Sequence, residues 1–145
     1  MHAESTARTS WQGTLARGSG TTSLGSGVTS PLGVSWAGRT ERTAGTTSPE
    51  ELIAAAHASC YAMALSHELA EAGATPESLD VSVTVTFELV DGAPTVSRSA
   101  LTVRGGASGI DEAGFAAAAA AAKDGCPVSR ALKGNVEITL DAALA

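Results

Sequence analysis

The sequence SPEELIAAAHASCYAMAL, residues 48–65, predicts a helix that begins sharply and carries Cys60, one of the two cysteines of the chain, near its middle. Ser48 is a favourable N-cap, the proline after it suits the first helical position, and Glu51 stands where it would complete a capping box. No residue interrupts the helix before Gly73, which can adopt the left-handed conformation that ends many helices. Most of its side chains are small, so another element can approach closely. We therefore expect a central, buried helix whose cysteine faces an interface.

The composition of the chain excludes several classes of protein. A length of 145 residues is typical of one domain, so we expect residues 1–145 to form a single domain. Aromatic residues are few, which favours an oligomer that shares a core. The net charge of -6 argues against a nucleic-acid-binding protein. No apolar segment approaches the roughly 20 residues that span a bilayer, and the first ten residues lack the apolar stretch of a signal peptide. A cytoplasmic protein is expected.

The clearest strand follows the central helix. Apolar and polar residues alternate strictly from Val81 to Leu89, which is typical of a strand with one buried face. A second helix is expected to begin at a cap, Asp111, and to end at Gly125, with Lys123 near its end. The other expected elements are a frayed start (1–10), a hairpin (11–24) with its turn at 18–20, a short strand (34–36), a polar loop (37–47), a strand (95–103), a loop (105–109), a helical turn (127–134) and a last strand (136–140). This order predicts an α+β fold with largely antiparallel sheets and two main helices.

Each of the two cysteines is expected to lie beside a helix. A cysteine on an alanine-rich helix is often only a small buried apolar residue, and this interpretation fits either cysteine alone. Cys126 differs, because Gly125 and Pro127 place its sulfur at the start of a helix, where backbone N–H groups favour a thiolate. In a chain expected to be cytoplasmic, two cysteines indicate reactive chemistry or a metal more than a structural disulfide.

Two histidines stand near Cys60 in the sequence. His57 precedes it by one helical turn and His67 follows by about two, so a metal site that also includes Cys126 is one alternative, although the spacing matches no common zinc pattern. A hydrolase with His57 as the base is another, but no third group or oxyanion loop is evident. We favour His57 as a buried histidine with satisfied ring nitrogens, or as a residue that supports the site.

Two segments of the chain resemble the cysteine motifs of one known family. SPEELIAAAHASC, residues 48–60, and AKDGCPVS, residues 122–129, resemble the first and second cysteine motifs of the OsmC/Ohr family of thiol-dependent peroxidases. The resemblance covers nearly the whole chain, and His57 together with the ending GCPVS is similar to the OsmC branch. It implies an OsmC-like α+β fold, an intertwined homodimer, and active sites at the subunit boundary.

The resemblance also implies catalytic roles. Cys60 would be the peroxidatic cysteine, Cys126 the resolving cysteine, and Glu50 the catalytic glutamate. The catalytic arginine would be Arg39, with Arg42 as the fallback because this loop carries one residue more than the family pattern. A guanidinium stabilises a thiolate and can bond peroxide oxygens, while a carboxylate fixes its direction. Ten residues of helix separate Glu50 from Cys60 by about 15 Å, so we expect the glutamate to act through the arginine, at a site completed across a dimer interface.

These features predict a peroxidase that reduces organic hydroperoxides to alcohols through a Cys60 sulfenic acid and a Cys60–Cys126 disulfide. Sulfur carries the redox change, so no metal, flavin or haem is expected. The expected partners are an organic hydroperoxide, a dithiol reductant, which the resemblance implies is lipoyl-type, and a second copy of the chain, with no nucleic acid and no membrane. The alternative on the same fold is a redox-sensing or small-ligand-binding protein without rapid peroxide turnover.

Overall fold

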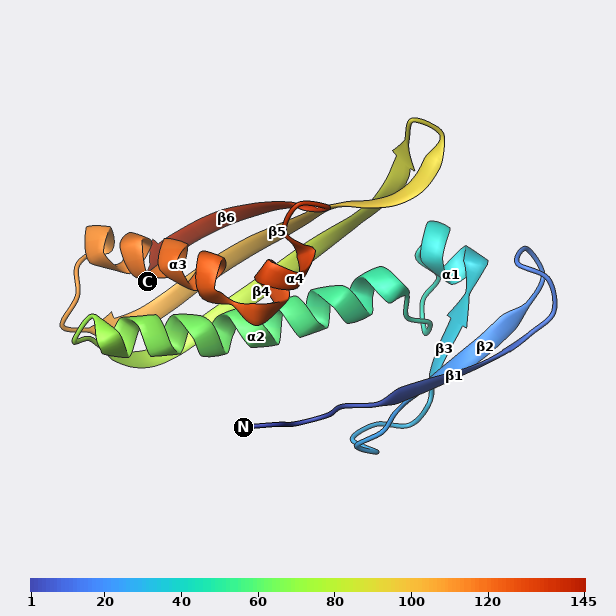
Figure 1. The fold of residues 1–145 in the computed structure, drawn as a ribbon, viewed down its shortest axis with the longest axis horizontal. Helices are drawn as coiled ribbons and strands as arrows, with labels where there is room; N and C mark the ends of the chain where they lie inside the picture. Colours follow the sequence, from blue (N-terminus) through green and yellow to red (C-terminus); the bar gives the residue numbers. More distant parts are fainter. The chain divides into compact units, whose positions relative to one another are not determined.

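The computed structural model describes residues 1–145, and their contacts divide the chain into two compact units, Met1–Leu52 and Ile53–Ala145. Each unit holds a three-stranded sheet. The sheets and the four helices labelled in Figure 1 confirm the expected α+β class. None of the helices is long and apolar enough to cross a membrane. The expected single domain stays a prediction.

The sheet of the first unit is antiparallel throughout, in the order β1 (Ala7–Gln12), β2 (Ser19–Leu24) and β3 (Leu32–Ser35). The expectation of a frayed start over residues 1–10 is wrong from Ala7 on, because β1 begins there. This strand is exposed along its whole length, so it lacks the apolar alternation that identifies a half-buried strand. It is held instead by its pairing with β2, and Thr9 and Thr22 share a hydroxyl–hydroxyl hydrogen bond of 2.8 Å across the pair. The turn of the hairpin also lies earlier than expected, between Gln12 and Ser19.

A short helix, α1 (Trp36–Thr40), lies where the sequence predicts a polar loop. Its N-cap is Ser35, whose hydroxyl accepts a hydrogen bond of 2.9 Å from the Gly38 backbone N–H. A five-residue helix is too short to show an apolar period, which is why the loop expectation failed here. After α1, the backbone N–H of Thr47 donates to the Gly33 carbonyl at 2.9 Å. This bond holds the segment just before the next helix beside β3.

Helix α2 (Pro49–Glu71) has the N-cap that the sequence predicts, because the Ser48 hydroxyl accepts a hydrogen bond of 3.1 Å from the Glu51 backbone N–H. The second half of the capping box is absent: the Glu51 carboxylate accepts instead from the Thr47 hydroxyl at 2.7 Å. At the other end Gly73 adopts a φ of +82°, which confirms its expected left-handed conformation.

The exposure of α2 differs from one face to the other. Within the second unit its buried side chains recur at every fourth position: His57, Tyr61, Leu65 and Leu69. Another face is open, with Met63 68% exposed. The expected burial of this helix is therefore confirmed for one stripe of α2 in the single chain, and the other face is not covered.

The sheet of the second unit has the order β4 (Thr75–Val90), β5 (Ala93–Ser108) and β6 (Glu137–Leu144). β4 and β5 form an antiparallel hairpin whose turn residues, Asp91 and Gly92, both have positive φ. β6 is parallel to β5, the one exception among the strand pairs to the largely antiparallel pairing that the sequence predicts. The reason is the connection, because α3 and α4 lie between β5 and β6 in the chain and form the long crossover that a parallel pair needs.

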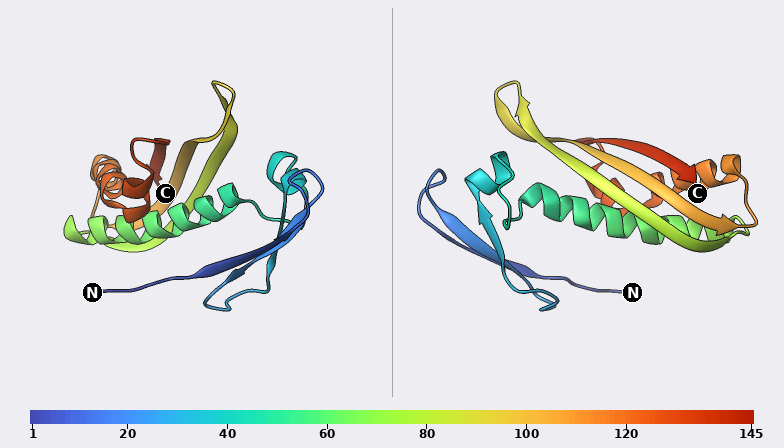
Figure 2. Two further views of the ribbon diagram at one scale, coloured as in Figure 1. Left: turned by 45° about the vertical axis from the view of Figure 1, so that its right-hand side comes forward. Right: turned by 180° about the vertical axis from the view of Figure 1, so that it is seen from behind.

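Helices α2, α3 (Glu112–Gly125) and α4 (Pro127–Leu132) cover one face of this sheet, as both views in Figure 2 show. Asp111 caps α3 as expected, since its carboxylate accepts a hydrogen bond of 2.8 Å from the Gly114 N–H. β5 continues through Gly105, where a loop was expected. A Cβ at this position would lie 2.7 Å from the Phe115 ring, so the glycine allows the strand and helix α3 to approach closely. The core residues include Tyr61, Leu65, Leu69, Leu101, Val103, Phe115, Ala119, Ala122 and Cys126.

Candidate functional site

The second unit brings the two cysteines together. Cys60 lies on α2, and Cys126 is the residue from which α4 begins, immediately before Pro127. Both thiols are free; Cys126 is fully buried and Cys60 is half-buried. The two side chains are close enough for a hydrogen bond between them. Two reduced thiols in mutual contact, one of them accessible, are the arrangement that thiol–disulfide chemistry requires.

The protonation of Cys60 depends on three neighbours. Burial raises the pKa of the Cys60 thiol, a hydrogen bond from the Val128 backbone N–H lowers it, and the hydrogen bond and charge of Cys126 raise it further. The balance favours the protonated thiol in this unit at neutral pH. Because the thiolate is the nucleophilic form, a reactive Cys60 requires an additional positive group nearby.

Tyr61, the residue after Cys60, fixes this part of α2 to α3. Its hydroxyl donates a hydrogen bond of 3.0 Å to the Ala119 carbonyl, and its side chain is fully buried. Burial, and then the charge of the neighbouring Cys126, raise the pKa of the Tyr61 phenol. It therefore remains a neutral donor, and its position depends on packing and one hydrogen bond.

His57 is fully buried, and both of its ring nitrogens are bonded. Nδ1 lies 2.7 Å from the Ser99 hydroxyl on β5, and Nε2 lies 2.7 Å from the Ser129 hydroxyl on α4. Burial lowers the pKa of His57, so the ring is neutral. This confirms the prediction of a buried histidine with a satisfied ring. No local pattern in the sequence points to either serine, because their contacts with His57 join segments 42 and 72 residues apart.

The two alternatives that used His57 lose their support. As a hydrolase base it would bond Cys60, but both nitrogens are engaged by serines. The predicted metal site also includes His67, but His67 is exposed whereas His57 is buried. No group of three or more histidine, cysteine or carboxylate side chains could hold a metal ion.

The first unit brings together the other two residues proposed from the motif. Arg39 lies in the last turn of α1 and Glu50 in the first turn of α2. Nη2 of Arg39 lies 2.7 Å from Oε1 of Glu50, and Nε lies 3.1 and 3.2 Å from the two carboxylate oxygens. The Glu50 side chain is 4% exposed and that of Arg39 29%. The carboxylate is hidden, and it orients a guanidinium that keeps an accessible face.

Arg42, the fallback for the catalytic arginine, has a different partner. It has a left-handed backbone, with φ of +58°, and its Nη1 donates to the Ser48 hydroxyl at 2.6 Å. Arg42 therefore supports the N-cap of α2, whereas Arg39 forms the ion pair with Glu50. The two arginines between which the sequence did not decide therefore have different partners.

Arg39 also lines a cavity of about 440 Å³ within the first unit. It is the only charged residue of the lining, in which the apolar side chains are Ala7, Trp11, Leu15, Val34, Trp36, Pro49 and Leu52. A mostly apolar cavity with one polar group suits a ligand with an apolar body and one polar end.

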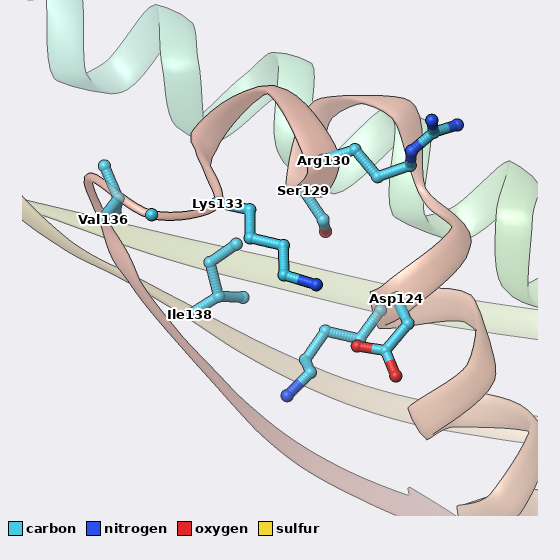
Figure 3. Close-up of a pocket in the computed structure, with 8 residues that line it drawn as sticks. Asp124, Ser129, Arg130, Lys133, Val136 and Ile138 are labelled. Carbon is cyan, nitrogen blue, oxygen red and sulfur yellow. The ribbon is translucent and has the colours of Figure 1, made fainter.

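A smaller cavity, of about 200 Å³, borders α4 in the second unit. Figure 3 shows it between α4 and β6, with the Lys133 side chain extending across it. Its lining carries three cations and one carboxylate: Lys123, Arg130, Lys133 and Asp124. Ser129 lines this cavity and also bonds His57, so one side of α4 borders the cavity.

Comparisons with known proteins agree with the fold and the motifs. The profile of OsmC-like proteins matches residues 42–141, which include Glu50, Cys60 and Cys126 but not Arg39. Peroxiredoxin OsmC of Escherichia coli (strain K12) is 45% identical over 131 residues, which cover 90% of each chain. Among solved structures, the organic hydroperoxide resistance protein OhrB of Bacillus subtilis is 25% identical, with a TM-score of 0.69 over 94% of this chain and 97% of that one. The OsmC-like protein of Mycoplasma pneumoniae shares the fold at 15% identity, with a TM-score of 0.73 over 100% of this chain and 99% of that one.

Proposed function

The chain belongs to the OsmC family, and on that basis we propose that it is a thiol-dependent peroxidase that reduces organic hydroperoxides to alcohols. The observation that carries the proposal is the contact between Cys60 and Cys126, at the point where α2 meets the start of α4. One thiol is accessible and the other buried, which suits a division into an attacking and a resolving cysteine.

The proposed cycle has three steps. The Cys60 thiolate attacks the terminal peroxide oxygen, the O–O bond breaks, and the alcohol leaves with one proton while Cys60 becomes a sulfenic acid. The Cys126 thiol then condenses with that sulfenic acid, forming the Cys60–Cys126 disulfide and releasing water. A dithiol reductant attacks the disulfide, returns both cysteines to thiols, and leaves as its own disulfide.

The Arg39–Glu50 pair is the proposed source of positive charge for this chemistry. Within its own unit the Cys60 pKa is raised, chiefly by burial, so a cation is required to favour the thiolate. Arg39 is oriented by hydrogen bonds of 2.7–3.2 Å to a buried carboxylate. We propose that this guanidinium stabilises the Cys60 thiolate and the peroxide oxygens, at a site completed in a homodimer.

The cavity beside Arg39 supports an organic substrate. An alkyl hydroperoxide has an apolar body and a polar O–O–H end, which match the apolar lining and the guanidinium. The name of the Bacillus subtilis relative refers to organic hydroperoxides as well. For the reductant we propose a small lipoyl-type dithiol, which would attack the more accessible sulfur, that of Cys60.

The test is thiol alkylation and peptide mass mapping after one equivalent of tert-butyl hydroperoxide has been added to the reduced protein. We expect a Cys60–Cys126 disulfide in the wild type, overoxidised Cys60 in Cys126→Ser, and no oxidation of Cys126 in Cys60→Ser. If both thiols of the wild type stay free over minutes, the peroxidase proposal fails. A disulfide that forms without repeated turnover in the presence of dihydrolipoamide would favour the redox-sensing alternative.

A further inference from the structure

Helix α4 has few attachments of its own. It spans six residues, of which only Ser129 is buried, and no side chain caps its start. A helix of this length is not stable alone, so its position depends on tertiary contacts. One side borders the cavity of about 200 Å³ drawn in Figure 3. The hydrogen bond between the Ser129 hydroxyl and the His57 ring therefore helps to fix α4, beside the partial packing of Val128 against the core.

The partner of Ser129 is anchored on two other elements. His57 belongs to the buried stripe of the long helix α2, and its second ring nitrogen is bonded to Ser99 on β5. A neutral imidazole offers one donor and one acceptor, and each serine hydroxyl can play either part. The chain Ser99–His57–Ser129 is thus fully satisfied and joins β5, α2 and α4.

This chain of hydrogen bonds ends beside the cysteines. Ser129 lies in the first turn of α4, the turn that begins at Cys126 and is closed by the hydrogen bond of 2.9 Å from the Arg130 N–H to the Cys126 carbonyl. The residue before Ser129 is Val128, whose backbone N–H bonds the Cys60 sulfur. What fixes this turn also fixes Cys126 relative to Cys60.

We propose that Ser99, His57 and Ser129 form a positioning clamp that holds the first turn of α4, and with it the resolving Cys126, against Cys60. The inference rests on the proposed peroxidase function and deepens it. The clamp acts on the second step, in which the Cys60 sulfenic acid and the Cys126 thiol condense to a disulfide and water. The competing reaction is attack of a second hydroperoxide on the sulfenic acid, which yields sulfinic acid and alcohol. A loosened α4 shifts the partition towards sulfinic acid. Because the Val128 N–H of the same turn bonds the Cys60 sulfur and lowers its pKa, a loosened α4 also slows the first step.

The two serines provide a matched pair for the test. Ser99→Ala and Ser129→Ala each remove one buried hydroxyl bonded at 2.7 Å to the same ring, but only Ser129 lies on α4. The readouts are the rate of thiol loss at Cys60, followed by dimedone trapping of the sulfenic acid, and the sulfinic fraction of Cys60 after graded tert-butyl hydroperoxide. We expect Ser129→Ala to raise the ratio of sulfinic acid to disulfide about fivefold, the order of one lost neutral hydrogen bond. This ratio does not depend on the rate of the first step, because both products form from the same sulfenic acid.

Ser99→Ala is expected to raise that ratio less, although its midpoint of urea unfolding falls by a similar amount. Equal ratios in the two variants, or a ratio in Ser129→Ala equal to that of the wild type, would overturn the clamp. If the wild type forms no disulfide at all, the proposed function has failed instead. Should Ser129→Ala not fold, His57→Gln takes its place, with peptide-level hydrogen exchange over residues 126–132. Exchange there no faster than in the wild type also overturns the clamp.

Discussion

Arg39 and Glu50 form an ion pair through three hydrogen bonds, in which both guanidinium and carboxylate are engaged at more than one atom. The pair fixes the last turn of α1 to the first turn of α2. Its two members are unequally buried, since the Glu50 side chain is 4% exposed and the Arg39 side chain 29%. The loss of one partner therefore has different consequences from the loss of the other.

Replacement of Arg39 by alanine is expected to destabilise the chain more than replacement of Glu50 by glutamine. Arg39→Ala leaves a buried carboxylate without its counter-ion, at a cost of about 3 kcal/mol in the free energy of unfolding, whereas Glu50→Gln leaves a neutral amide and a partly solvated arginine, at a cost of about 1 kcal/mol. Urea unfolding measures both. Glu51→Gln is the control, because Glu51 is exposed and its carboxylate accepts a hydrogen bond from the Thr47 hydroxyl rather than forming an ion pair. Equal losses for the first two variants would contradict the asymmetry.

The two arginines of the same segment can be separated by conservative substitution. A lysine at position 39 cannot hold the carboxylate through two nitrogens, so Arg39→Lys is expected to lower kcat/KM for tert-butyl hydroperoxide by about 10- to 100-fold. Arg42→Lys retains a donor for the Ser48 hydroxyl and is expected to stay within about threefold of the wild type. Peroxide consumption with dihydrolipoamide as reductant measures both variants. The reverse order would move the proposed role to Arg42.

The stability of the protein is expected to depend on pH through His57. Burial lowers its pKa, so below about pH 6.5 the unfolded chain binds a proton that the folded chain does not. The contribution of the neutral ring to the free energy of unfolding is present above that pH and decreases as the pH falls through the lowered pKa of the folded state. The groups bonded to the ring, Ser99 from β5 and Ser129 from α4, carry no charge.

The measurement is urea unfolding of the wild type and of His57→Gln at several pH values between 7 and 5. Carboxylates titrate in the same range, but their contributions cancel in the difference between the two proteins. We expect the stability advantage of the wild type to shrink as the pH falls. A difference that does not vary with pH would show that His57 has an ordinary pKa.

Local signals in the sequence identify the ends of helices and one long strand. Ser48 and Asp111 cap helices as predicted, Gly73 has the left-handed backbone, and the alternation from Val81 to Leu89 lies within β4. Each of these features depends on residues within a few positions of one another. The sequence alone therefore predicts these caps, this glycine conformation and this strand.

The features that the sequence does not reveal depend on distant residues. Gly105 belongs to a strand because it pairs with Leu79 and Leu144 on the neighbouring strands, and β6 is parallel because two helices precede it. In the candidate site, too, the sequence predicts the local features and not the contacts between distant residues. The motifs identify the two cysteines, but nothing local to Cys60 indicates that the Val128 N–H bonds its sulfur, or that Ser129 is tied to His57.

The proposed homodimer is testable at the open face of α2. Met63, in the middle of this helix, is 68% exposed in the single chain, and an apolar side chain so placed favours coverage by a second copy. Met63→Glu puts a charge on that face and is expected to weaken the dimer at least about tenfold, as measured by analytical ultracentrifugation. Val28→Glu is the control, because Val28 is 77% exposed but lies in the loop between β2 and β3.

The same variant tests where the active site is completed. If peroxidase activity requires two subunits, the activity per chain of Met63→Glu should fall with the fraction of dimer as the protein is diluted, while the alkylation of Cys60 in the denatured protein shows that the thiol is intact. Met63 bonds neither cysteine and lies outside both cavities described above. A monomeric Met63→Glu with full activity would place the whole site within one chain, and the Arg39–Glu50 pair would then have to reach Cys60 in that same chain.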